Sequence, residues 1–135
     1  MIGPRKMYPC EHNGDFNCEG EFLIVGVTKK GKLSLVHVDK EKDTHVKVNI
    51  KVKEIHKIIT GLRDVIEGDW KAFQYEKEKE YLNIERADCT EDRQHIVVLL
   101  EDEDADMGTA HLSQRNAEDL LKTIEKILRD GKLYP

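Results

Sequence analysis

Long apolar runs are absent from this sequence. The longest uninterrupted one, residues 96–100 (IVVLL), is far shorter than the roughly 20 residues that a membrane-spanning helix needs. The first residues, MIGPRK, carry charge and no apolar stretch follows them, whereas a secretory signal requires such a stretch. We therefore expect no membrane span and no secretory signal, and we predict a cytoplasmic location.

Cysteine is scarce as well. The chain has Cys10, Cys18 and Cys89 and no CxxC pair, and an odd number of cysteines argues for reduced thiols and against a disulfide framework. Cys10, His12 and Cys18 supply three of the four ligands of a tetrahedral zinc site, but no fourth ligand follows at the usual spacing. We predict no metal and no cofactor, with these three residues as the candidate ligands if a metal is bound.

The motifs of common enzymes are missing too. There is no GxSxG and no HExxH, and residues 26–32 (GVTKKGK) are followed by Leu33 where a phosphate-binding loop needs Ser or Thr. Residue types suited to nucleophilic catalysis are scattered without a connecting pattern: Asp88, Cys89, His95 and His111. Because no coherent site emerges, we predict that the protein is not an enzyme.

What the sequence has in abundance is charge. Of 135 residues, 36% are charged, and the net charge is −5. The two halves differ, because residues 1–70 carry 12 basic and 11 acidic side chains (net +1), whereas residues 71–135 carry 10 and 16 (net −6). This length predicts one domain with a sizeable core.

Alternating apolar residues predict three strands in the first half, at residues 22–28, 33–38 and 45–50. In the third, Val46, Val48 and Ile50 face one way. Residues 1–20 show no periodicity and contain two prolines, so we predict an irregular arm there.

Two amphipathic helices are predicted. Apolar residues from Val52 to Ile66 recur at three- and four-residue steps, and Gly68 is placed to end that helix. The second helix is capped by Ser113, and its apolar stripe runs from Ala117 to Leu128. Between the helices, residues 70–75, 81–86, 95–100 and 108–112 read as strands, with Leu82 and Ile84 facing inward.

These elements predict an α+β fold in which antiparallel sheets are covered by two helices. We expect an irregular arm over residues 1–20 and a single domain over residues 21–135, with halves at 21–68 and 69–135. The halves either descend from a degenerate strand-strand-strand-helix duplication or share only the generic order of a meander followed by a helix.

An acidic segment, EDEDAD at residues 101–106, places three aspartates at alternate positions. A calcium loop of the EF-hand type is excluded, because Met107 occupies the position that needs glycine. The segment is either a solvated loop or an acidic patch for a basic partner surface.

A basic segment lies in the first half. Residues 29–57 contain nine lysines and four acids, net +5, but Phe22 is the only aromatic residue from 21 to 69. The lysines either keep exposed strand edges soluble or follow a phosphate backbone.

Residues 106–113 (DMGTAHLS), together with the helix after them, resemble the end of the PC4-like transcriptional coactivator family, in which a strand leads through a Leu-Ser/Thr cap into a helix behind a curved sheet. The resemblance implies single-stranded nucleic-acid binding by a dimer or a tandem repeat.

We predict from the sequence a non-catalytic binding or regulatory protein, such as an inhibitor, that recognises a protein partner through a sheet face and charged loops. Its candidate partner-binding residues are Asp102, Glu103, Asp104, Asp106, Lys40, Lys42 and Lys47. The alternative is a PC4-like module that binds single-stranded nucleic acid through the lysine-rich first half.

We also predict a homodimer, because residues 21–28 carry no charge between Phe22 and Val27 and would form a poorly protected sheet edge. The competing arrangement has the N-terminal arm covering that edge.

Overall fold

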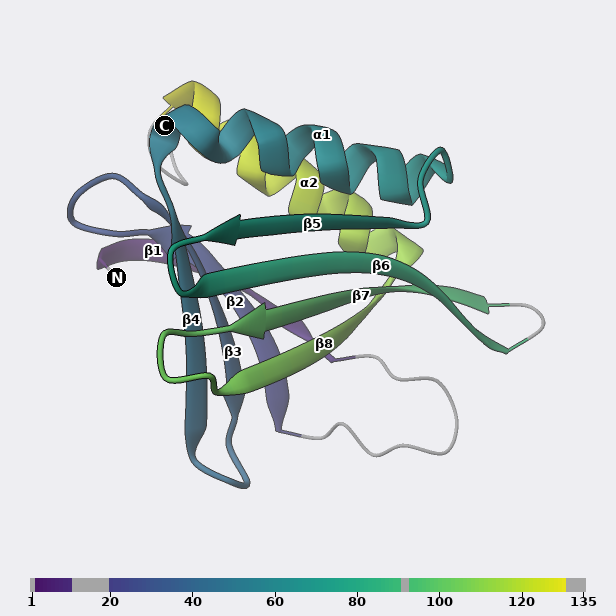
Figure 1. The fold of residues 1–135 in the computed structure, drawn as a ribbon, viewed down its shortest axis with the longest axis horizontal. Helices are drawn as coiled ribbons and strands as arrows, with labels where there is room; N and C mark the ends of the chain where they lie inside the picture. The colour runs from purple at the N-terminus through teal and green to yellow at the C-terminus, as the bar shows by residue number, and fades with distance from the viewer. Residues whose placement is uncertain (1, 11–19, 91–92, 131–135) are drawn as a thin grey trace.

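The computed structural model describes residues 2–10, 20–90 and 93–130 (Figure 1). Within these residues, eight strands form two four-stranded antiparallel sheets, each in the order of the chain. The first sheet contains β1 (Ile2–Pro9), β2 (Glu21–Val27), β3 (Leu33–Asp39) and β4 (Thr44–Ile50). The second sheet contains β5 (Ala72–Lys77), β6 (Glu80–Thr90), β7 (Arg93–Glu101) and β8 (Met107–Ser113). The predicted α+β class is confirmed.

One helix follows each sheet. A short 3₁₀ turn, η1 (Val52–Glu54), precedes α1 (Ile55–Glu67), which ends at Gly68 in the left-handed conformation with φ 85°. That conformation favours glycine, as the sequence predicts. Val52 is 51% exposed, so the apolar stripe of the helix begins at Ile55.

The second helix, α2 (Gln114–Asp130), begins directly after β8. The Oγ of Ser113 accepts a hydrogen bond from the Asn116 N–H at 3.2 Å, which is the geometry of an N-cap. The predicted stripe is buried at Ala117, Leu120, Ile124 and Ile127. Leu128, at its end, is 37% exposed.

The N-terminal segment differs from its prediction. Residues 2–9 form β1, which pairs with β2 through Met7 opposite Ile24 and Tyr8 opposite Leu23. Residues 11–19 lie outside the described part of the chain. With β1, the first half has four strands and a helix, as the second half has, in place of the predicted three strands and a helix.

This pairing also removes the premise of the predicted homodimer. Because β2 lies between β1 and β3, it is an interior strand and offers no free edge to a second copy. The competing arrangement, in which the N-terminal segment covers that edge, is the one found.

The two sheets cross, and α1 and α2 lie side by side at one end of the molecule (Figure 1). The inward faces of both sheets and the apolar stripes of both helices form one hydrophobic core. Where the sheets meet, Gly108 of β8 lies against His37 of β3, so closely that a Cβ at Gly108 would overlap the imidazole. The core therefore depends on a glycine at the crossing point.

Two tyrosines join the halves. The Tyr8 hydroxyl of β1 donates to Asp119 Oδ2 at 2.8 Å and lies 3.0 Å from Thr123 Oγ1, both on α2. The Tyr75 hydroxyl of β5 donates to Glu54 Oε2 at 2.8 Å, directly before α1. Burial raises the pKa of both hydroxyls, so both remain protonated donors at neutral pH.

Among the described residues, no helix is long and apolar enough to cross a membrane.

Candidate functional site

The outward face of the first sheet is defined by the residues whose side chains point away from the core. Strand register places Met7, Ile24, Val36 and Lys47 in one row across the sheet. The complete set, which we call the first outward face, is Met7, Pro9, Phe22, Ile24, Gly26, Ser34, Val36, Val38, His45, Lys47 and Asn49. It contains no acidic residue.

The centre of the first outward face is apolar and its rim is basic. Ile24 and Val36 are 9% exposed, and Met7 is 45% exposed. Lys40 reaches over the face, with its Nζ 4.9 Å from the centre of the Phe22 ring. Lys47 and His45 are exposed on the edge strand β4. Ile24 and Val36 are therefore nearly buried, and the face offers a ligand Met7, the partly exposed ring of Phe22 and several cations.

Two polar atoms on this face are buried without a hydrogen-bond partner among the described residues, Ser34 Oγ and Asn49 Oδ1. The two residues stand opposite each other on β3 and β4. An unpaired buried polar group costs about 1–3 kcal/mol, and such a group in a native protein calls for an explanation.

The outward face of the second sheet has the opposite charge. The set that we call the second outward face is Ala72, Gln74, Glu76, Tyr81, Asn83, Glu85, Val97, Leu99, Glu101, Met107, Thr109 and His111. It contains three glutamates and neither lysine nor arginine. Val97 and Leu99 are half-buried at its centre, and Met107 is 58% exposed.

The predicted acidic residues lie at one end of the second sheet. The turn between β7 and β8 and the turn between β5 and β6 surround a hollow of about 500 Å³. Asp102 and Glu103 line this hollow, and they are joined there by Glu76, Glu78, Glu80 and Glu101. The structure therefore extends the predicted acidic patch with residues that the sequence places far away.

Asp102 also organises its own turn. Its Oδ1 accepts hydrogen bonds from the Asp104 N–H at 2.9 Å and the Asp106 N–H at 3.0 Å. The carboxylates of Asp102, Asp104 and Asp106 lie within 4.8 Å of one another. An aspartate that binds nearby backbone N–H groups is a common turn-forming device, which accounts for the clustering.

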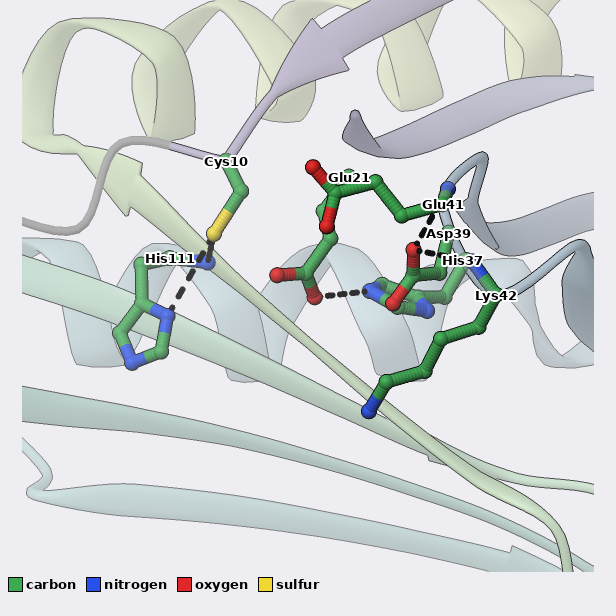
Figure 2. A network of polar contacts seen from close by, with 7 residues as sticks. All are labelled: Cys10, Glu21, His37, Asp39, Glu41, Lys42 and His111. Carbon is green, nitrogen blue, oxygen red and sulfur yellow. Dashed lines mark hydrogen bonds and ion pairs between the residues drawn. The ribbon is translucent and has the colours of Figure 1, made fainter. Parts of the chain in front are cut away.

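The three predicted basic residues belong to the first sheet. Lys47 stands on its outward face, and Lys40 covers Phe22 there. Lys42 lies in the β3–β4 turn, where its N–H and that of Glu41 donate to Asp39 Oδ1 at 3.1 and 3.0 Å (Figure 2). The acidic and basic residues therefore belong to different sheets, although Glu80 beside the acidic hollow accepts the N–H of Asn49 on β4 at 2.8 Å.

Of the three candidate metal ligands, the structure describes one. Cys10 is described, and its Sγ lies 3.5 Å from His111 Nδ1 and accepts the His111 N–H at 3.3 Å (Figure 2). His12 and Cys18 lie outside the described residues. Of the residue types suited to nucleophilic catalysis, the backbones of Asp88, Cys89 and His95 lie in β6 and β7, and His111 stands on β8.

Among the side chains that the structure describes, His37 is a buried histidine, 5% exposed. Its Nε2 lies 3.2 Å from Glu21 Oε1, on the inward side of the first sheet (Figure 2). Because it also packs against Gly108, its place is at the junction of the sheets and not on either outward face.

Sequence reasoning missed Met7 and Phe22 as parts of a site. Met7 was missed because β1 was not predicted. Phe22 precedes a run of apolar residues in which period-two alternation is hard to see, and only the register with Val38 shows that it points outward.

Comparison with known proteins shows similarity of fold. No family model matches the chain, and no curated protein matches its sequence. Among solved structures, Trypanosoma brucei MRP1/MRP2 is similar, with a TM-score of 0.59 and 10% sequence identity. The similarity covers 96% of this chain and 88% of that one. At this identity the likeness concerns the architecture alone.

Proposed function

We propose that this protein binds single-stranded nucleic acid across the first outward face. The observation that carries the proposal is a sheet face whose accessible side chains include Met7, Phe22, His45 and Lys47, with Lys40 over the ring and no acidic residue at the outward positions. Proteins that bind single strands combine cations that follow the backbone with apolar and aromatic side chains on which bases stack. The PC4-like resemblance of residues 106–113 supports the same class of ligand.

Different side chains of the face suit different parts of a nucleotide. Phe22, with Met7 and His45 on the same face, offers surfaces for bases, and Lys40 and Lys47 offer cations for phosphates. A single ring gives few stacking positions, and stacking contributes about 1–3 kcal/mol per base. We therefore expect low affinity and a strong dependence on salt.

The test is fluorescence anisotropy with a labelled, mixed-sequence single-stranded oligonucleotide. If Lys40, Lys42 and Lys47 each contact a phosphate, the logarithm of affinity falls against the logarithm of salt with a slope of about −2, or about twentyfold between 50 and 200 mM. The triple variant Lys40→Glu, Lys42→Glu, Lys47→Glu should abolish binding, and Phe22→Ala should weaken it about fivefold or more.

A matched control changes the same charge elsewhere. The triple variant Lys53→Glu, Lys57→Glu, Lys126→Glu alters η1, α1 and α2 and leaves the first outward face intact. It should retain binding. No binding at low salt, or an equal loss in both triple variants, would refute the proposal.

A second candidate function is the binding of a basic protein partner, with the protein acting as a regulator or inhibitor. The hollow at the end of the second sheet favours it, because six carboxylates from two turns and the adjoining strand ends line it, together with Lys79. A partner recovered by pull-down from the host should lose affinity when Asp102, Glu103, Asp104 and Asp106 are changed to lysine. Unchanged affinity would remove this candidate. We infer a cytoplasmic setting from the sequence, because three cysteines suit a reducing compartment.

A further inference from the structure

A groove of about 630 Å³ runs between α1 and β5, at the edge of the second sheet and away from the first outward face. Figure 1 shows the helix and the strand lying alongside each other. The helix wall is formed by residues at three- and four-residue spacing, Lys57, Thr60, Gly61 and Asp64. The strand wall is formed by five consecutive residues, 72–76.

Consecutive residues of a strand point to opposite faces of its sheet. A groove lined by all of them therefore exposes the edge of β5. The order of the second sheet makes β5 an edge strand, which pairs with β6 alone among the described strands. The groove is thus a channel between a helix face and a free strand edge.

The register shows which backbone groups face this channel. The Lys71 carbonyl accepts the N–H of Arg86, which stands opposite it, at 2.9 Å. In an antiparallel pair, hydrogen-bonded and non-hydrogen-bonded positions alternate. The N–H and C=O groups of Ala72, Gln74 and Glu76 consequently point away from β6 and toward the groove.

The middle of the groove has an apolar floor. Phe73 packs against Gly61 so closely that a Cβ at Gly61 would overlap the ring. This contact sets how closely α1 approaches β5 at this point.

One end of the groove carries an aromatic ring and a carboxylate. Trp70 is 65% exposed, the largest exposed fraction among the exposed large apolar side chains of the described residues. Asp64 lines the same groove, and its carbonyl accepts the N–H groups of Asp69 and Trp70 at 2.9 and 3.3 Å. The neighbouring Arg63 is paired with Glu125 at 2.9 Å. A ring beside a carboxylate suits a lysine or arginine side chain.

We propose that this groove binds an extended peptide, which joins the second sheet as a strand beside β5 and places a lysine or arginine against Trp70 and Asp64. Strand addition to a free edge obtains its affinity from backbone hydrogen bonds and its specificity from side-chain pockets. The peptide is extended because the edge of β5 offers free backbone N–H and C=O groups. It is basic because the carboxylate of Asp64 at the end of the groove is complementary to a cation. This site is separate from the first outward face and does not depend on nucleic-acid binding.

The test is selection from a displayed library of random hexapeptides on the full chain, with parallel selection on Gln74→Pro. Proline at 74 removes an N–H that points into the groove and leaves the ladder with β6 intact. Gln74→Ala, which changes only the side chain, is the matched control. We expect peptides with a fixed lysine or arginine to be enriched on the natural chain and on Gln74→Ala, and at least tenfold less on Gln74→Pro.

Trp70 is the single tryptophan of the chain, so its emission reports the site directly. A selected peptide, synthesised alone, should shift that emission to shorter wavelength and saturate. Trp70→Ala, at an exposed position where folding is not at risk, should lower the affinity of the same peptide at least fivefold.

Equal enrichment on the natural chain and Gln74→Pro, or no enrichment on either, would overturn the proposal. Its failure is distinguishable from failure of the nucleic-acid proposal, because Gln74→Pro should leave oligonucleotide binding unchanged. Conversely, Lys47→Glu should leave peptide binding unchanged.

Discussion

The two sheets share a topology and an inward pattern, yet the faces that they turn outward carry opposite charge. Both run through four antiparallel strands in chain order and then into a helix. Inward positions are occupied by the same residue types, such as Val48 and Ile50 in the first sheet and Val98 and Leu100 in the second. Outward, the first sheet carries Lys47 on β4, whereas the second carries Glu85 on β6 and Glu101 on β7. Packing constrains one side of each sheet, and the other side is free to differ.

The halves are also tied to each other by the same device, used twice. A tyrosine in the first strand of each half, Tyr8 or Tyr75, donates to a carboxylate that belongs to the helix region of the other half. Each carboxylate also pairs with a lysine: Asp119 with Lys6, and Glu54 with Lys77 at 2.6 Å. The comparison of the halves can therefore be tested at the crossing, at the tyrosines, at the carboxylates and at the outward faces.

A large effect on stability is expected where the two sheets cross. Gly108→Ala introduces a Cβ that overlaps the ring and Cβ of His37. Overpacking of a tightly filled core costs about 1–3 kcal/mol, so we expect the free energy of unfolding to fall by that amount in urea denaturation. In the His37→Ala background, where the ring is absent, the same change should cost less.

Equal costs in the two backgrounds would contradict this account of the crossing. Alanine ordinarily suits a strand at least as well as glycine, so even the sign of the change is informative. Stabilisation by Gly108→Ala would show that the two sheets can move apart at this point without a loss of free energy of unfolding.

The second prediction compares the two tyrosines. Tyr8→Phe removes a hydroxyl that contacts both Asp119 and Thr123, whereas Tyr75→Phe removes one that contacts Glu54 alone. A hydrogen bond to a charged group contributes about 1.5–3 kcal/mol and a neutral one about 1 kcal/mol. We expect Tyr8→Phe to cost about 1 kcal/mol more than Tyr75→Phe in denaturant unfolding. Equal losses would mean that the Thr123 contact contributes nothing.

The burial pattern of each half could be predicted from the sequence. The contacts that join the two halves could not. Val46, Val48, Ile50, Leu82 and Ile84 are buried as the alternation predicts. Helix ends at Gly68 and Ser113 followed from local capping chemistry. These features depend on neighbours in the sequence, and so a single sequence reveals them.

The missed features depend on distant partners. β1 contains Pro9, which discourages a strand prediction, but an edge strand tolerates proline because its outer N–H needs no partner. Tyr8 and Asp119 are 111 positions apart. Phe22 shares its face with Lys40 only because β2 and β3 pair in one particular register. No local pattern carries that information.

The third prediction concerns the carboxylate beside Tyr75. Hydrogen bonds from Lys77 and then Tyr75 lower the pKa of Glu54 from 4.5 to about 2. A carboxyl whose pKa is lower in the folded state contributes stability that is complete above its unfolded pKa and is lost as the pH falls through its folded pKa. Stability should therefore decline between pH 4.5 and about 2 in part through this group.

Glu54→Gln removes that contribution. Its urea midpoint should vary less with pH over this interval than that of the natural chain, and Asp64→Asn, for whose carboxyl no such hydrogen bonds are found among the described residues, is the control. Parallel pH profiles for Glu54→Gln and the natural chain would contradict the assignment.

The smallest effect on the fold is expected at the outward faces, where the comparison is sharpest for function. Changing Glu76, Glu85 and Glu101 to lysine gives the second outward face the sign of the first. Outward side chains of this kind usually alter stability by no more than about 0.5 kcal/mol each. In the chain that already carries glutamate at 40, 42 and 47, the three new lysines should restore weak oligonucleotide binding at low salt, since cations on an open sheet supply the salt-dependent part of such binding. Anisotropy measures it, and the same lysines should leave the far-ultraviolet circular dichroism unchanged. If binding does not return, lysines alone are not sufficient, and oligonucleotide binding also requires the apolar side chains around Phe22 and Val36. The two faces would then differ in more than the sign of their charge.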